Sequence, residues 1–236
     1  MISEYLASEP VQEALKVLRE QFPLAIWETV YVTVLSTFFA TIVGLPLGVL
    51  LVAGENNKII RVPKGLLHAL NVIINLLRSV PFLILMIMVF PLTRLIVGTV
   101  VGTPASVVPL VIAAFPFIAR LVEGSLREIN PNIIEAAQSM GASPFQIIVK
   151  VMIPESVPSL ISNATIAITT VLGYSAMSGI IGGGGLGKIA INYGYYNFKF
   201  IVMWAAVIGL IILVQLFQSM GTRLANRCDK RLRKKN

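Results

Sequence analysis

The sequence has one cysteine, one histidine and few charged residues. Of its 236 residues, 13% are charged and 56% are hydrophobic, whereas an average soluble domain is about a quarter charged and about half apolar. The single Cys228 excludes a disulfide framework within the chain, and His68 has no second His, Cys or carboxylate nearby in sequence to complete a metal site. A Ser, His and Asp set for nucleophilic catalysis is also missing, so we expect no catalytic site on this chain.

The basic residues do not follow a nucleic-acid-binding pattern. Lys and Arg number 19 against 11 Asp and Glu, a formal charge of +8, and much of this excess lies in residues 223–236. A DNA or RNA surface needs basic and aromatic residues spread over a soluble face, but here the basic residues punctuate long apolar runs. Composition therefore predicts an integral membrane protein that contacts lipid and no nucleic acid.

Several apolar stretches are long enough to cross a bilayer, which takes about 20 helical residues. With approximate boundaries they are residues 24–53, 66–93, 100–121, 157–181 and 200–222. Each is expected to be helical, because lipid offers no partner to the backbone of an isolated span. The predicted fold is an all-α membrane protein whose transmembrane domain, 24–222, includes a loop at 122–156 and is followed by a basic tail, 223–236.

Lys and Arg indicate the orientation of these spans, because basic loops stay in the cytoplasm. They gather on the side of the C-terminus, which predicts a cytoplasmic C-terminus and, after five crossings, an outer N-terminus. The N-terminal segment, 1–23, contains an amphipathic helix over residues 10–22. We favour an interfacial anchor for this helix, with packing across a neighbouring subunit as the alternative.

The cytoplasmic loop carries strong local signals for structure. Asn130 and Pro131 are typical of a helix start, and Gly141 fits the left-handed residue that closes a helix. Ser143 opens a second short helix, and Pro154 is expected to end it. The first helix is too apolar and too short to stand alone in water. It therefore either packs on its own bundle or enters a groove on another protein, and the residues alone do not decide between the two.

The same loop resembles a family signature. Glu135, Ala136 and Ala137 are followed, after three residues, by Gly141. After nine further residues comes Val151, and after one more residue come Ile153 and Pro154. This string resembles the cytoplasmic signature of ATP-binding-cassette importer permeases of the type I fold, in which Ile and Leu stand where this chain has Val151 and Ile153. The resemblance implies a coupling helix that docks in a cleft of an ATPase subunit. It assigns coupling contacts to Glu135, Ala136, Ala137 and Gly141, and gives Pro154 the role of setting the angle of the fourth span.

The resemblance also implies an assembly. Its expected parts are a second copy of this chain, two cytoplasmic ATPase subunits and an extracytoplasmic substrate-binding protein, in the bacterial cytoplasmic (inner) membrane. ATP and Mg would bind the ATPase, and this chain would hold no cofactor. Residues 78–82, 116–120 and 173–177 resemble permeases of methionine importers, so methionine is the favoured cargo. Another hydrophobic amino acid or a short peptide remains an alternative, and an ion-coupled secondary transporter is a weaker one, because the sequence offers neither inverted repeats nor an ionisable residue at mid-membrane.

The fourth span is unusually polar for a helix that faces lipid. Five spans are too few to enclose an amino-acid path, so we expect a homodimer with the path on its two-fold axis. Candidate path residues are Thr169, Tyr174, Ser175 and Met177. The alternative is that these hydroxyls bond the carbonyls of their own helix.

Arg78 and the glycine-rich segment 182–187 each allow a functional and a structural interpretation. Arg78 lies within an apolar run and pairs with a substrate carboxylate or, as we favour, extends to cytoplasmic water, with a helix bend at Pro81. Residues 182–187 match a dinucleotide-binding pattern in form only, because they follow a membrane span. A flexible outer hinge, or close approach to a binding protein, fits them better.

Overall fold

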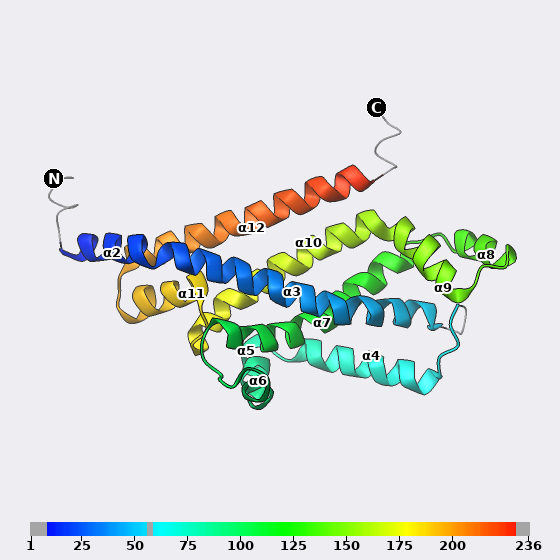
Figure 1. The fold of residues 1–236 in the computed structure, drawn as a ribbon, viewed down its shortest axis with the longest axis horizontal. Coiled ribbons are helices and arrows are strands. Elements are labelled where there is room, and N and C mark those ends of the chain that lie inside the picture. Colours follow the sequence, from blue (N-terminus) through cyan, green and yellow to red (C-terminus); the bar gives the residue numbers. More distant parts are fainter. Residues whose placement is uncertain (1–8, 56–58, 230–236) are drawn as a thin grey trace. The chain divides into compact units, whose positions relative to one another are not determined.

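The computed structural model describes residues 9–55 and 59–229, and within these ranges the chain is helical and contains no strand. The expected all-α fold is confirmed. Lys230–Lys235, the most basic part of the predicted tail, lies outside the described residues. Figure 1 shows the helices in chain order. They are α2 (Glu9–Glu20), α3 (Phe22–Ala53), α4 (Lys64–Ser79), α5 (Phe82–Met88), α6 (Phe90–Val97), α7 (Thr103–Arg127), α8 (Pro131–Ser139), α9 (Pro144–Gln146), η2 (Ile147–Met152), α10 (Ile153–Ser178), η3 (Gly179–Ile181), α11 (Gly185–Ile189), η4 (Ala190–Tyr196) and α12 (Phe200–Cys228).

Four helical stretches of the described chain are long and apolar enough to cross a membrane. These are Phe22–Ala53, Thr103–Arg127, Pro144–Ile181 and Phe200–Cys228, and the broken pair α4 and α5 adds a fifth if it is counted as one span. The break falls at Val80, which is extended with ψ 126°, because a residue before proline is disfavoured in the helical region. The expected bend at Pro81 is therefore confirmed.

Pro154 does not end a helix, and in this respect the sequence-based prediction is wrong. The chain continues from α9 through η2 into α10 as one helical stretch, Pro144–Ile181. The segment η2 is a π-helix, in which the backbone N–H of Ile153 donates to the carbonyl of Ile148, five residues earlier. Proline removes one backbone donor and crowds the preceding turn, and the wider π turn directly before Pro154 accommodates both. The loop and the fourth span are thus joined by continuous helical backbone.

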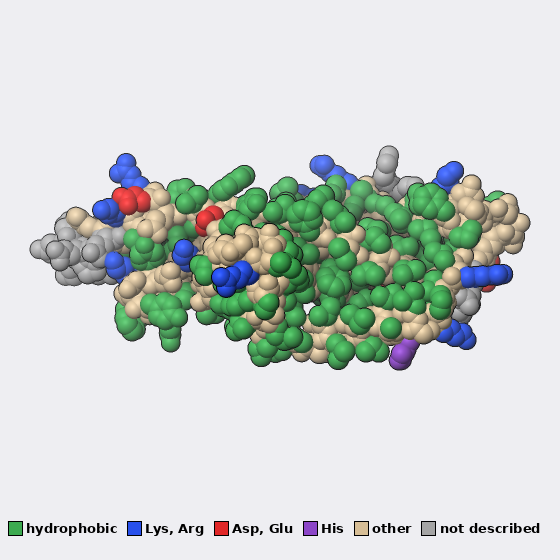
Figure 2. Space-filling view, turned by 60° about the horizontal axis from the view of Figure 1, so that its bottom comes forward, with side chains coloured by type: hydrophobic (Ala, Val, Ile, Leu, Met, Phe, Trp, Pro, Cys, Tyr) green, Lys and Arg blue, Asp and Glu red, His purple; other side chains and the backbone are tan. Residues whose placement is uncertain are grey.

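The chain divides into two compact units, which we describe separately. Unit 1 comprises Met1–Thr37, Phe82–Val111 and Ile168–Phe217, and unit 2 comprises Phe38–Pro81, Ile112–Ala167 and Gln218–Asn236. Apolar side chains also cover much of the surface in view in Figure 2, as expected of a chain that faces lipid or partner subunits.

The core of unit 1 contains the apolar face of α2. Ala14 of α2 is buried with Leu186 of α11 and Val202 of α12, and Phe22 and Tyr193 pack against this cluster. Gln21 and Tyr193 exchange side-chain hydrogen bonds of 2.8 and 3.0 Å. The amphipathic helix exists as predicted, and Ala14 of its apolar face packs on its own chain while Leu15 stays 51% exposed. Its interpretation as an interfacial anchor stays a prediction.

The core of unit 2 joins α3, α4 and α7. Leu51, Ile74 and Ala119, one from each helix, form its buried centre. The two glycines of α3 bring backbones close: a Cβ at Gly44 or Gly48 would overlap α7. This packing positions the end of α7, from which the cytoplasmic loop of the sequence analysis leaves.

Candidate functional site

The loop after α7 forms a capped helical knob, which we define as residues 131–146. Its first helix, α8, starts where the sequence predicts. The side chain of Asn130 accepts a hydrogen bond of 3.0 Å from the backbone N–H of Asn132, and Pro131 occupies the first turn. Both residues reduce the number of unpaired backbone N–H groups at the helix start, since Asn130 accepts from one and Pro131 has none.

Gly141 closes α8 in the left-handed conformation, as the sequence predicts. Its φ is +78°. The N–H of Gly141 donates to the carbonyl of Gln138 at 2.9 Å, and the N–H of Ala142 donates to the carbonyl of Ala137 at 3.1 Å. These two bonds form a Schellman motif, which reverses the chain and pairs carbonyls that would otherwise be left open at the helix end.

Ser143 then starts the helix that leads out of the knob. Its hydroxyl accepts from the N–H of Gln146, and the Gln146 side chain accepts from the N–H of Ser143 at 2.8 Å, a complete capping box. No break follows, so α9 runs through η2 into α10. The structure thus gives the knob one continuous helical connection to a membrane span.

The knob exposes large apolar side chains. Met140 is 81% exposed and Phe145 is 74% exposed. Glu135 and Ala136 are also exposed, whereas Ala137 is buried where α8 packs against η2. The small side chain of Ala136 leaves the helix backbone accessible, and exposed apolar side chains on a short helix suit insertion into a groove of another protein.

The signature residues therefore separate into two groups. Glu135, Ala136 and Gly141 lie on the exposed part of the knob, while Ala137 supports it from inside. Pro154 lies inside the helical stretch that leaves the knob, directly after the π turn, and its role in setting the angle of the fourth span stays a prediction.

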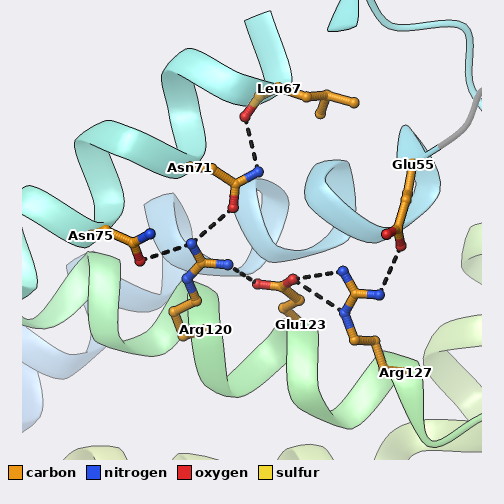
Figure 3. Close-up of polar contacts among 7 residues, drawn as sticks. All are labelled: Glu55, Leu67, Asn71, Asn75, Arg120, Glu123 and Arg127. Carbon is orange, nitrogen blue, oxygen red and sulfur yellow. Dashed lines mark hydrogen bonds and ion pairs between the residues drawn. The ribbon is translucent and has the colours of Figure 1, made fainter.

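Behind the knob, the end of α7 carries a polar network that links three helices (Figure 3). Glu123 accepts hydrogen bonds from both Arg120 and Arg127, and Arg127 Nη1 also donates to Glu55 at 2.7 Å. Arg120 Nη2 donates to the side-chain oxygens of two asparagines on α4, Asn71 at 2.8 Å and Asn75 at 2.9 Å. The two arginine and two glutamate charges cancel, and the buried carboxylate has donors on both oxygens.

Sequence reasoning missed this network. Arg120 was considered among the basic residues that mark orientation and within the segment 116–120, with no partner assigned to it, and Glu123 was not singled out. The available signal is the spacing of Arg120, Glu123 and Arg127, which puts them on one face of a helix. Asn71 and Asn75 show the same one-face spacing within an apolar span. Their partnership with α7 is not visible in local sequence, because the bonded residues are 45 and 49 positions apart.

The candidate path residues on α10 are in part committed to contacts inside unit 1. Tyr174 stacks on Phe82, with ring centroids 4.7 Å apart and planes 5° apart. Ser175 is buried and donates to the carbonyl of Leu172 in its own helix at 2.8 Å. For Ser175, therefore, the alternative of bonding its own helix is confirmed.

The other path candidates are less enclosed. Thr169 is half-buried and Met177 is exposed, both on α10 in unit 1. Arg78 is exposed in the last turn of α4, in unit 2. That Arg78 reaches cytoplasmic water stays a prediction, and none of these three positions by itself identifies a ligand site.

The glycine-rich segment 182–187 is a site of close backbone packing inside unit 1. Gly179, Gly183 and Gly187 are buried, and a Cβ on any of them would overlap neighbouring atoms. The carboxylate of Glu28 on α3 accepts from the N–H of Gly185 at 2.7 Å and from the hydroxyl of Thr103 at 2.8 Å. These contacts hold the segment against its own chain in this conformation. A hinge, or an approach to a binding protein, stays a prediction.

Comparison with known proteins gives close relatives for this architecture. The chain is 46% identical over 207 residues to a probable D-methionine transport system permease protein MetI from Vibrio cholerae serotype O1, which covers 88% of this chain and 92% of the relative. It is 48% identical over 154 residues to the D-methionine transport system permease protein MetI of Escherichia coli (strain K12), covering 65% of this chain and 70% of that protein.

Solved structures agree. A chain from inward-facing conformations of the MetNI methionine ABC transporter is 43% identical, with a TM-score of 0.86, and the match covers 94% of this chain and all of the other. A chain from an amino acid ABC transporter with histidines, 19% identical with a TM-score of 0.68, shares the fold. The family model described as "binding-protein-dependent transport system inner membrane component" matches residues 44–234. The chain belongs to this family of inner membrane transport components.

Proposed function

We propose that the chain is the membrane-spanning permease of an ATP-driven importer for methionine. The observation that carries the family is the match over residues 44–234, and the cargo follows from the D-methionine transport permeases that are 46–48% identical to it. The exposed apolar side chains of the knob support an ATPase partner, because such side chains are costly in water unless a second protein covers them.

The assembly that we propose contains two copies of this chain, two cytoplasmic ATPase subunits and an extracytoplasmic binding protein, in the bacterial inner membrane. The knob lies on the cytoplasmic side, with the N-terminus outside and the C-terminus inside. ATP and Mg bind the ATPase, and this chain binds no cofactor and catalyses no reaction of its own.

The proposed mechanism is alternating access. Closure of the ATPase pair on ATP displaces the knob, and the uninterrupted helix Pro144–Ile181 carries this displacement into the membrane. The path then opens outward to receive methionine from the binding protein, and release of the hydrolysis products returns it inward. Cargo passes between the two copies of the chain, and the exposed thioether of Met177 on α10 is a candidate contact for the methionine side chain.

Transport in proteoliposomes tests this function. Complexes of this chain with its ATPase are reconstituted, supplied with the binding protein and labelled methionine outside, and loaded with ATP and Mg inside. We expect uptake that requires ATP and the binding protein and that unlabelled methionine suppresses. Uptake driven by a proton or sodium gradient without ATP would support the secondary transporter instead. ATP-driven uptake suppressed better by another hydrophobic amino acid or a short peptide would change the cargo and keep the family.

A further inference from the structure

The network at the base of the knob connects the helix that enters the knob to two neighbouring helices. Arg120 and Glu123 lie on α7, Asn75 on α4, and Glu55 directly after α3 (Figure 3). Its inner and outer members differ in exposure. The side chains of Arg120 and Glu123 are 20% and 11% exposed, whereas those of Arg127 and Glu55 are 47% and 46% exposed.

The inner pair is costly to bury, so its presence needs a reason. Placing a carboxylate and a guanidinium out of water carries a desolvation penalty that attraction between them only partly returns, and apolar residues of similar size are often as stabilising. Arg120 offsets part of the penalty by donating to Asn71 and Asn75 as well as to Glu123. Asn71 is itself held in place, because its side-chain N–H donates to the carbonyl of Leu67 at 3.0 Å.

The polar contacts fix the relative position of α4 and α7, which we call their register, and the apolar contacts do not. The core around Leu51, Ile74 and Ala119 packs the same three helices together, but apolar contact is non-directional and lets helices slide. Hydrogen bonds from one guanidinium to two asparagines one turn apart fix both the height and the rotation of α4 against α7.

This fixed register lies immediately before the knob. Residues 128–130 alone separate the end of α7 from the start of α8, and Ile129 among them is buried. A displacement of α8 therefore reaches α7 within a few residues. The network is the part of unit 2 that can transmit this displacement from α7 to α4 while the two helices keep their relative position.

We propose that Arg120 and Glu123 are positioning residues that transmit movement of the knob to α4, so that ATP hydrolysis and transport stay coupled. This inference rests on the proposed function, because it needs an ATPase that moves the knob. In this inference Arg120 and Glu123 transmit movement of the knob, and neither residue contacts cargo or nucleotide.

The test measures methionine transported per ATP hydrolysed, in proteoliposomes that contain equal amounts of intact complex. Glu123→Gln removes the charge that holds Arg120. The double variant Asn71→Leu with Asn75→Leu keeps the Arg120–Glu123 pair and removes the link from Arg120 to α4, together with the bond from Asn71 to Leu67 within α4. We expect both variants to hydrolyse ATP within about twofold of the wild-type rate and to lower the ratio at least about fivefold, the lower end of ordinary coupling energies.

Two control variants each remove one charge but keep the contacts of Arg120 with Glu123 and with α4. Glu55→Gln breaks the exposed pair with Arg127, and Arg223→Gln neutralises an exposed residue of α12 in the same unit. Both are expected to leave the ratio within about twofold, because exposed ion pairs contribute little.

The outcomes are distinguishable. A wild-type ratio in the asparagine double variant, or transport and ATP hydrolysis that fall together in it, would overturn the inference and give the network a purely structural role. If Glu123→Gln does not assemble, the asparagine double variant decides alone. Failure of the proposed function would appear differently, as wild-type complex that shows no ATP-driven methionine uptake.

Discussion

Replacing Gly141 by alanine perturbs the turn that closes the knob. Gly141 has φ +78°, and a side chain in this left-handed region costs about 1–2 kcal/mol. A Cβ there would meet no atom of a more distant residue within 4 Å, so the cost comes from the local backbone conformation and not from a clash with neighbouring side chains. By the relation between free energy and population, 1–2 kcal/mol changes the opening equilibrium of the turn by a factor of about 5–30.

Hydrogen exchange measures this change directly. The N–H groups of residues 141 and 142 donate to the carbonyls of Gln138 and Ala137, so they exchange only when the turn opens. In Gly141→Ala we expect peptides that cover this turn to exchange about 5–30 times faster, while peptides from α12 keep the wild-type rate. Gly141→Asn should show a smaller increase, because asparagine tolerates the left-handed region better than alanine.

A second glycine gives the matched control. Gly124 in α7 also has free space where a Cβ would lie, but its φ is not positive. Gly124→Ala should leave exchange unchanged or slow it slightly, since alanine favours helix by about 1 kcal/mol over glycine. If Gly141→Ala exchanges at the wild-type rate around the turn, the reasoning about its strained closure is refuted.

Two further predictions concern unit 1. Gly187→Ala should lower the thermal midpoint of the complex, because its Cβ overlaps the backbone of Ala176 and overpacking costs about 1–3 kcal/mol. The control Gly173→Ala, in the same unit, has free space around its Cβ and should leave the midpoint unchanged. Equal midpoints for the two variants would contradict the packing argument. Glu28→Gln should weaken the hold on the N–H of Gly185 by about 1–2 kcal/mol, visible as faster hydrogen exchange in residues 182–189, and unchanged exchange there would show that the carboxylate does not hold this segment.

Features that depend on local chemistry could be predicted from the sequence. Asn130, Gly141 and Ser143 act within a few residues of themselves, so the start, the closure and the restart of the knob follow from cap chemistry alone. The apolar runs likewise fix the long helices, because the thickness of the bilayer sets their length.

Features that depend on distant partners could not. Pro154 is a local exception: it follows the rule for a helix end, but a π turn formed by the residues directly before it lets the helix continue. The apolar face of α2 matches a lipid anchor equally well, and only the fold shows that Ala14 on this face packs with α11 and α12. Arg120 looks like an ordinary basic residue until the fold brings Asn71 and Asn75 beside it.

The central claim is that the knob docks into an ATPase, and a crosslink from Ala136 tests it most directly. Ala136→Cys is made with Cys228→Ser, so that the only native thiol is removed, in complex with the ATPase subunit carrying single cysteines around its cleft. Because Ala136 is exposed and Ala137 is buried, we predict efficient crosslinking to the ATPase from position 136 and much less from Ala137→Cys. An intact complex that transports methionine but gives no crosslink from position 136 to any cysteine of that cleft would contradict the account.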